Sequence, residues 1–256
     1  MNKIRISLLA TAFVGAVLAI ASSASAADLP VKAPPMVTPP PPVFNWSGFY
    51  VGGQVGYGWG HTNADTFNAN TGAFIATGEN DRNGWFGGGQ IGYNYIFASH
   101  WLLGIEGDIA GGDIHGSAVN CSSATACAQA DVKTSWFGTL RGRLGYTWNN
   151  WMLFGSGGGA WVHHSTDRTI VASGALPAAV GAVASSSETS SGWTAGGGAE
   201  WGFAPHWSAK LEYLYIHHDA TANFNYPAFP AANRINNSTN HLNIVRLGVN
   251  YLFNVP

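Results

Sequence analysis

The sequence carries little charge. Only 9% of its 256 residues are Asp, Glu, Lys or Arg, whereas soluble domains average about 25%. The formal net charge is −2 and the basic residues form no stripe, which argues against a nucleic-acid partner. The mean hydropathy is only +0.04, which also argues against a bundle of membrane-spanning helices. Low charge and neutral hydropathy together favour a membrane barrel, in which lipid-facing and lumen-facing residues cancel.

Long hydrophobic runs are absent after the first 20 residues. Before that point, Lys3 and Arg5 precede a 13-residue apolar run, Leu8–Ile20, and Ala24-Ser25-Ala26 forms a small-residue cleavage site. The run is shorter than the ~20 residues that a membrane-spanning helix needs. We therefore predict a cleaved signal peptide over residues 1–26, which directs export.

Cysteine is scarce, with only Cys121 and Cys127. Export places both in an oxidising compartment, where pairing is favoured, so we expect a disulfide that closes a small loop. The alternative is two unpaired thiols. A metal site is disfavoured because no ligand-spaced His or Cys accompanies them.

The aromatic residues cluster at the two ends of about eight glycine-rich segments. These are Ser47–Gly60, Gly84–Phe97, Trp101–Ile114, Lys133–Trp148, Trp151–His164, Ser191–Phe203, Trp207–His218 and Asn240–Phe253. Apolar residues occupy every second position along them, which indicates strands. Aromatic ends around an alternating middle are typical of strands that cross a bilayer, with rings at both headgroup levels.

The connections between these segments alternate in length. Three are tight, at 98–100, 149–150 and 204–206, and four are long and polar, at 61–83, 115–131, 165–190 and 219–239. Short turns belong to the periplasm and long loops to the exterior. We therefore predict an all-β fold over residues 46–256, an eight-stranded antiparallel transmembrane β-barrel of the outer-membrane type. It would have four long exterior loops and both termini in the periplasm. A soluble β-sandwich would explain neither the aromatic girdles nor the loop alternation.

Proline dominates the stretch before the first strand, with seven prolines between Pro30 and Pro42. Proline has a fixed φ and no backbone donor, so this stretch is extended and joins no sheet. We interpret residues 27–45 as a Pro-rich periplasmic spacer. An inert tail is favoured over a contact with peptidoglycan.

Balanced charges occupy the positions that should face the lumen. They are Glu106, Asp108, Glu200 and Glu212 with Arg141, Arg143, Lys210 and Arg246. A Lys or Arg on the lipid face would cost about 2–4 kcal/mol at the midplane, so these side chains should point inward. The interior of an eight-stranded barrel is just wide enough for side chains to fill it. We predict that the charges pair and plug the lumen, with glycine making room for the long side chains.

The two ends of the chain resemble a known family. Ala-Asp-Leu-Pro after the signal, the proline-rich spacer, Trp46–Gly53 (WSGFYVGG) and Leu247–Phe253 (LGVNYLF) are similar to porin-superfamily outer-membrane proteins of alphaproteobacteria. These surface antigens are often described as outer-membrane immunogenic proteins. The resemblance implies an eight-stranded barrel, exposed variable loops and a role in envelope integrity or host contact; some relatives bind hemin. Such barrels usually end on an aromatic residue that the assembly machinery reads, whereas here three residues follow Phe253.

Histidines gather near the expected exterior rim. His163, His164, His217 and His218 end two of the strands, and His61, His115 and His241 lie near the same rim. Imidazoles on neighbouring loops could bind a metal or haem iron. Tolerance of polar aromatics at the rim is the favoured explanation, so we predict no resident cofactor.

No motif supports an enzyme. Gly155–Ala160 matches a dinucleotide fingerprint but lies inside a strand, whereas that motif must open a helix. His164-Ser165 near Asp167 and Asp219 suggests an esterase. Adjacent strand residues point to opposite faces, so His164 is badly placed to activate Ser165.

The sequence therefore predicts a structural protein of the cell outer membrane that supports the envelope and presents surface loops. A narrow channel for small solutes is the first alternative and a hemin or metal receptor the second. The expected partners are outer-membrane lipid and lipopolysaccharide, and the barrel assembly machinery.

Overall fold

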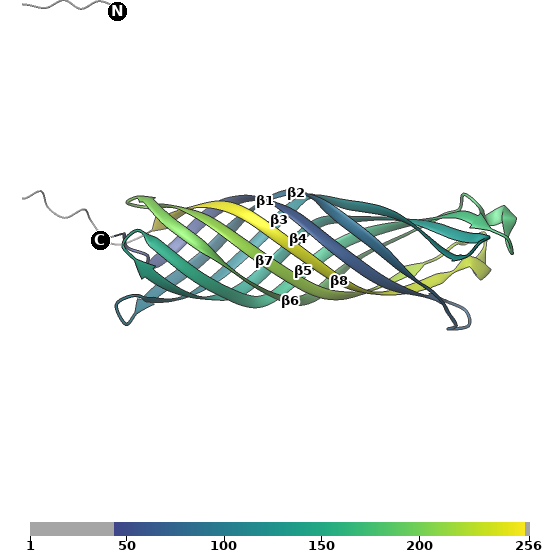
Figure 1. Cartoon of the computed structure of the whole chain (residues 1–256), viewed down its shortest axis with the longest axis horizontal. Helices are drawn as coiled ribbons and strands as arrows, with labels where there is room; N and C mark the ends of the chain where they lie inside the picture. Colours follow the sequence, from purple (N-terminus) through teal and green to yellow (C-terminus); the bar gives the residue numbers. More distant parts are fainter. Residues whose placement is uncertain (1–43, 254–256) are drawn as a thin grey trace, which may run out of the picture. The chain divides into compact units, whose positions relative to one another are not determined.

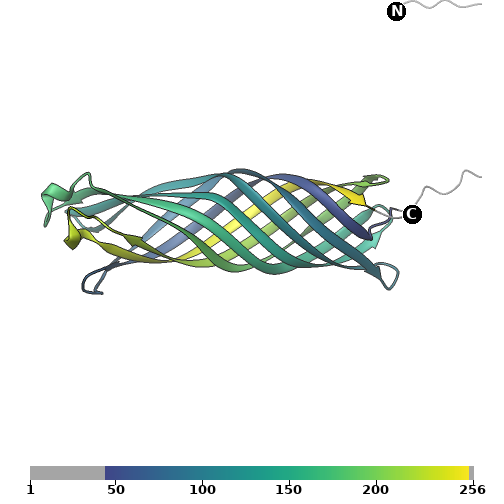
Figure 2. The ribbon, with the colours of Figure 1, turned by 180° about the vertical axis from the view of Figure 1, so that it is seen from behind.

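A computed structural model describes residues 44–253. Eight antiparallel strands close into one barrel in chain order, as predicted (Figures 1 and 2). The strands are β1 (Gly48–Asn68), β2 (Phe74–Phe97), β3 (Trp101–Ser123), β4 (Ala126–Trp148), β5 (Trp151–Ser173), β6 (Val183–Ala204), β7 (Trp207–Phe224) and β8 (Arg234–Phe253). Two short 3₁₀ helices, η1 (Pro177–Ala179) and η2 (Pro230–Ala232), lie in connections. No helix in the described range is long and apolar enough to cross a membrane.

The predicted signal peptide, and the predicted spacer as far as Val43, lie outside the described residues. Phe44 and Asn45, the end of that spacer, are described, and Phe44 packs inside the barrel. β1 begins and β8 ends at the same end of the barrel, beside the tight turns at 98–100, 149–150 and 205–206 (Figure 2). We call this end the inner end and the opposite end the outer end.

The alternation of side chains sorts the strands into a lipid face and a lumen face. Val55, Ile91, Ile109 and Leu247 are more than half exposed on the outside. Exposed rings flank this apolar surface, at the inner end Trp101, Trp148, Trp151, Trp201 and Trp207, and toward the outer end Trp59, Trp85, Trp136, Trp161 and Trp193. The predicted facing of the strands therefore agrees with the structure. The aromatic rings mark the two headgroup levels of the membrane.

The prediction of four long exterior loops needs correction. Most of residues 61–83, 115–131, 165–190 and 219–239 belongs to the strands, and the outer connections are reduced to 69–73, 124–125, 174–182 and 225–233. The register between β1 and β8 runs without interruption from Phe49↔Phe253 to Asn68↔Arg234. Beyond the membrane both faces of a strand can be polar, so the hydrophobic alternation stops while the hydrogen-bond ladder continues.

Glycine has two different roles in the wall. On the lumen face, a Cβ at Gly88 would lie 2.2 Å from the Ile109 carbonyl oxygen, and one at Gly198 would lie 2.1 Å from that of Leu211. On the lipid face, the nearest atom to a Cβ at Gly53 or Gly142 would be 3.9 Å away. The expectation that glycine makes room for lumen side chains therefore applies only to the inward-facing glycines.

Candidate functional site: the filled lumen

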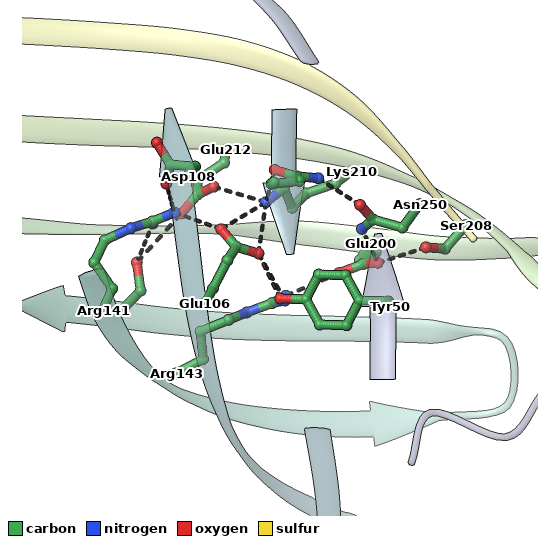
Figure 3. Close-up of polar contacts among 12 residues, drawn as sticks. Tyr50, Glu106, Asp108, Arg141, Arg143, Glu200, Ser208, Lys210, Glu212 and Asn250 are labelled. Carbon is green, nitrogen blue, oxygen red and sulfur yellow. Dashed lines mark hydrogen bonds and ion pairs between the residues drawn. The ribbon is translucent and has the colours of Figure 1, made fainter. Parts of the chain in front are cut away.

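All eight predicted lumen charges meet inside the barrel. Figure 3 labels all of them except Arg246. Strand alternation explains why, because Glu106 and Asp108 on β3, Arg141 and Arg143 on β4, and Lys210 and Glu212 on β7 are spaced two residues apart. The side chains of these six residues are fully buried. The charges are therefore satisfied by one another rather than by bulk water.

Glu106 is the centre of this network. Its carboxylate contacts all four bases, namely Arg141, Arg143 (3.1 Å), Lys210 (2.9 Å) and Arg246 (3.4 Å). The Tyr50 hydroxyl also donates a hydrogen bond to it at 2.6 Å. Figure 3 shows the carboxylate between the ends of side chains that come from opposite walls. A single acid thus links strands that are not neighbours.

The other three acids complete the pairing. Glu212 contacts Arg141, Lys210 (3.3 Å) and Arg246 (2.8 Å). Asp108 accepts from Arg141 at 2.8 Å and from Thr139 at 2.6 Å. Glu200 contacts Arg143 at 2.8 Å. Four acids against four bases leave this layer without net formal charge.

Sequence reasoning missed the neutral members of the network. The Asn250 amide donates to Glu200 at 2.7 Å, Lys210 donates to Gln90 at 2.8 Å, and Ser208 also donates to Glu200. The neutral residues Asn250, Gln90 and Ser208 are all buried. Strand alternation could have identified them as inward-facing. Each lies two residues along its strand from another lumen residue or is paired with one on the neighbouring strand.

Apolar side chains close the lumen on both sides of the network. Toward the outer end, the next inward residues after Asp108, Thr139, Glu212 and Arg246 are Ala110, Phe137, Leu214 and Ile244, which belong to one buried cluster with Phe86, Val162 and Leu242. Toward the inner end, a second cluster consists of Phe44, Trp46, Tyr50, Leu102, Met152, Phe154 and Leu252. We call these the outer seal and the inner seal. The charged layer lies between two clusters of buried apolar side chains.

Comparison with known proteins identifies the family. The model of the outer membrane protein beta-barrel domain matches residues 14–253. The chain belongs to this family. The 31 kDa outer-membrane immunogenic protein of Brucella melitensis is 32% identical over 245 residues, covering 91% of this chain and 95% of the relative. The 22 kDa outer membrane protein of Rhizobium leguminosarum bv. viciae is 29% identical over 181 residues, covering 69% and 66%.

Solved structures are more distant. The outer membrane protein OprG from Pseudomonas aeruginosa covers 80% of this chain and 97% of its own, with a TM-score of 0.47 and 13% identity. The family and its relatives place the protein in the outer membrane. The predicted family is thereby confirmed.

The histidine candidates of this family member do not form one cluster. His164 and His218 are buried in the lumen with ring centroids 5.9 Å apart, whereas His163 and His217 lie on the outside. On the outside, His217 approaches His241, with 3.3 Å between their Nδ1 atoms, and His163 stacks on Trp136. The sequence placed all four at the rim. Strand alternation directs His164 and His218 into the lumen and His163 and His217 to the exterior face. Within the described residues, no group of three or more His, Cys, Asp or Glu side chains could hold a metal ion.

Cys121 and Cys127 form a disulfide between paired positions of β3 and β4. His164 faces inward and Ser165 lies on the next position of β5, so alternation directs them to opposite faces.

Near the outer tip, the Tyr226 hydroxyl donates to the Arg168 carbonyl at 3.0 Å. Burial raises the pKa of Tyr226 and lowers the pKa of Arg168. These groups occupy the lumen beyond the outer seal.

Proposed function

We propose that this protein is a structural outer-membrane barrel that supports the envelope, displays its outer turns and does not conduct. The observation that carries the proposal is the sealed charge network. A water-filled pore needs a continuous polar path, and here both sides of the network are covered by apolar side chains. Removing one partner of a buried ion pair is strongly destabilising, so a core of linked ion pairs favours a rigid wall.

Single-channel recording tests the closed lumen. Folded protein in a planar bilayer should give no discrete current steps, after a heat-dependent gel shift has shown that the barrel is folded. Liposomes from the same preparation should retain a small entrapped dye, and protease accessibility of the outer turns should show that the barrel is inserted. Reproducible steps from inserted protein would instead support the narrow solute channel.

A deletion strain tests the role in the envelope. Loss of the protein should increase sensitivity to detergent, and the wild-type chain should restore resistance. A matched variant in which residues 174–182 are replaced by a two-residue Asn-Gly turn keeps the barrel but removes one displayed segment. It should restore detergent resistance as well as the wild type does. Failure of both chains to restore resistance would contradict an envelope role.

A hemin or metal receptor remains the second candidate, and the pair of His217 and His241 on the exterior face favours a metal ion. Two nitrogens that bind one tetrahedral ion at about 2.0–2.1 Å lie roughly 3.4 Å apart, close to the 3.3 Å between His217 and His241. Added zinc should then bind saturably, and His217→Ala should weaken that binding. A hemin iron could take only one of these two nitrogens, and its binding would be recorded as a saturable Soret shift. The matched control is His218→Ala, which alters the inward neighbour. An equal response of both variants would exclude the outer pair as the site.

The proposed surroundings follow from the same fold. Outer-membrane lipid and lipopolysaccharide would contact the exposed apolar wall, and the barrel assembly machinery would insert it. A contact of the proline-rich spacer with peptidoglycan is a further proposal. We propose no catalytic role, since the relatives are named as outer-membrane or immunogenic proteins.

A further inference from the structure

Strands β7 and β8 differ from most of the outer aromatic girdle. The exposed tryptophans toward the outer end lie on β1, β2, β4, β5 and β6. At that level the exterior face of β7 and β8 carries five hydrogen-bonding side chains, Tyr213, Tyr215, His217, His241 and Asn243. The register fixes their level, because His217 is paired with Trp193 of the girdle and His241 is paired with His217. We call these five residues and Trp193 the exterior polar patch.

The rings of the exterior polar patch contact one another. The Tyr215 hydroxyl lies 2.5 Å from His241 Nδ1, and His217 Nδ1 lies 3.3 Å from the same atom. The Trp193 ring centroid lies 5.5 Å from that of Tyr215 and 5.6 Å from that of His217. The patch is therefore a continuous surface across β6, β7 and β8, at the level where aromatic rings meet the outer headgroups.

Several nitrogen atoms of the patch have no protein partner. The Tyr213 hydroxyl donates to Asn243 Oδ1 at 2.6 Å, which leaves the Asn243 amide nitrogen free to donate. The Nε2 atoms of His217 and His241 also have no partner among residues 44–253. Because the two Nδ1 atoms face each other, a proton shared between the rings places an N–H on both Nε2 atoms. The singly charged pair thus offers two donors beside the free amide.

No acid neutralises this pair. Among the ion pairs of residues 44–253, none involves His217 or His241. By contrast, His61 on the neighbouring β1 contacts Asp81 at 2.6 Å. The exterior acid on β7, Asp219, lies two residues beyond His217 and forms no ion pair. The histidine pair is therefore available to an anion that approaches from the membrane.

We propose that the exterior polar patch binds the anionic sugar headgroup of one lipopolysaccharide molecule. The Nε2 atoms of His217 and His241 donate to a charged oxygen of the headgroup, as imidazolium groups do to phosphate. The Asn243 amide donates to a neighbouring oxygen, and Trp193 supplies an apolar ring face beside them. This inference rests on the proposed contact with lipopolysaccharide and assigns that contact to one surface. It requires no open lumen.

Native mass spectrometry of the folded protein released from detergent micelles tests the patch, because it counts bound lipids. Diphosphoryl lipid A is titrated at neutral pH with EDTA present, so that no metal ion occupies the histidine pair. We expect one lipid to bind preferentially. The double variant His217→Ala/His241→Ala should weaken it by about tenfold, the loss of one charge-assisted hydrogen bond or more. The matched control is His115→Ala, which removes an exterior imidazole that contacts Asp113 and should leave binding unchanged.

Three competitors identify what the patch recognises. Lipid A without its phosphates and phosphatidylglycerol, an anionic lipid without sugar, should both bind more weakly than diphosphoryl lipid A. Inorganic phosphate should not displace the bound lipid. Equal affinity for either lipid, or displacement by free phosphate, would overturn the proposal.

Equal affinity of the double variant and the wild type would also overturn it. If the double variant fails the heat-dependent gel shift, His217→Gln and His241→Gln decide, and unchanged affinity in both would reject the patch. Loss of the patch would leave the results of single-channel recording and of the deletion strain unchanged, so its failure is distinct from failure of the proposed structural role.

Discussion

Glu106 determines whether the central network is satisfied, because its carboxylate contacts four cations at once. Glu106→Gln would leave three acids against four bases between two apolar seals. Breaking a buried ion pair by removing one partner typically costs 3–5 kcal/mol. We expect a loss of about that size in the free energy of unfolding, measured by urea titration of the heat-dependent gel shift. Asp113→Asn, which alters an exposed ion pair, should change it by less than about 1 kcal/mol.

Arg143 provides a complementary test of the central network. Arg143→Leu should also lower the unfolding temperature, because Glu106 and Glu200 each lose a donor. The double variant Glu106→Gln/Arg143→Leu restores equal numbers of acids and bases, so its loss should be smaller than the sum of the two single losses. Strictly additive losses would mean that the two residues are not coupled.

At the scale of the strand, the cost in stability of replacing a glycine by alanine should depend on whether that glycine faces the lumen or the lipid. Gly88→Ala would place Cβ 2.2 Å from the Ile109 carbonyl oxygen, so the backbone must shift, at a cost of about 1–3 kcal/mol. Gly53→Ala lies on the neighbouring strand with 3.9 Å of clearance to the nearest atom and should change stability by less than about 0.5 kcal/mol. Urea midpoints of the two folded variants measure the difference. Equal midpoints would show that inward crowding is relieved by adjustment of the wall.

The strands were predictable where the bilayer imposes a pattern on the sequence. Phe49, Val51 and Val55 alternate with Tyr50, Gly52 and Gln54, and the structure places these two sets on opposite faces. The inward direction of the eight lumen charges was predicted from the same alternation. The extension of β1 through Thr62 and Thr66 could not be predicted in this way, because polar residues there occupy both faces and the period-two signal disappears.

The seals were missed for a related reason. In Trp85-Phe86, Trp136-Phe137 and Trp161-Val162 the first residue lies on the lipid face and the second is buried in the outer seal. Two adjacent apolar residues interrupt the alternation, and sequence reasoning assigned the rings to the girdle without placing their neighbours. The contacts of Arg82 on β2 with Thr62 on β1 and Asn240 on β8 depend on side-chain directions across three strands, which no single-strand pattern contains.

At the scale of the whole molecule, the barrel is much longer than the membrane is thick. β2 has 24 residues, which at about 3.3 Å per residue and a tilt near 40° extends roughly 60 Å along the axis. The apolar band of an outer-membrane barrel is about 25 Å tall. The outer parts of the strands therefore stand in water, where the closed hydrogen-bond ladder, the lumen contents and the Cys121–Cys127 disulfide hold them together.

Hydrogen exchange should distinguish a water-exposed barrel from four long loops. Amides of residues 61–66 and 236–242, which continue the β1–β8 ladder, should exchange slowly, because their hydrogen bonds open only with the wall. Amides in the turns at 69–73 and 98–100 should exchange fast and serve as internal controls. Slow exchange of both groups of strand residues in detergent and in liposomes would mean that the ladder, and not the lipid, maintains this part of the wall. Exchange as fast as in the turns would mean that these segments are loops.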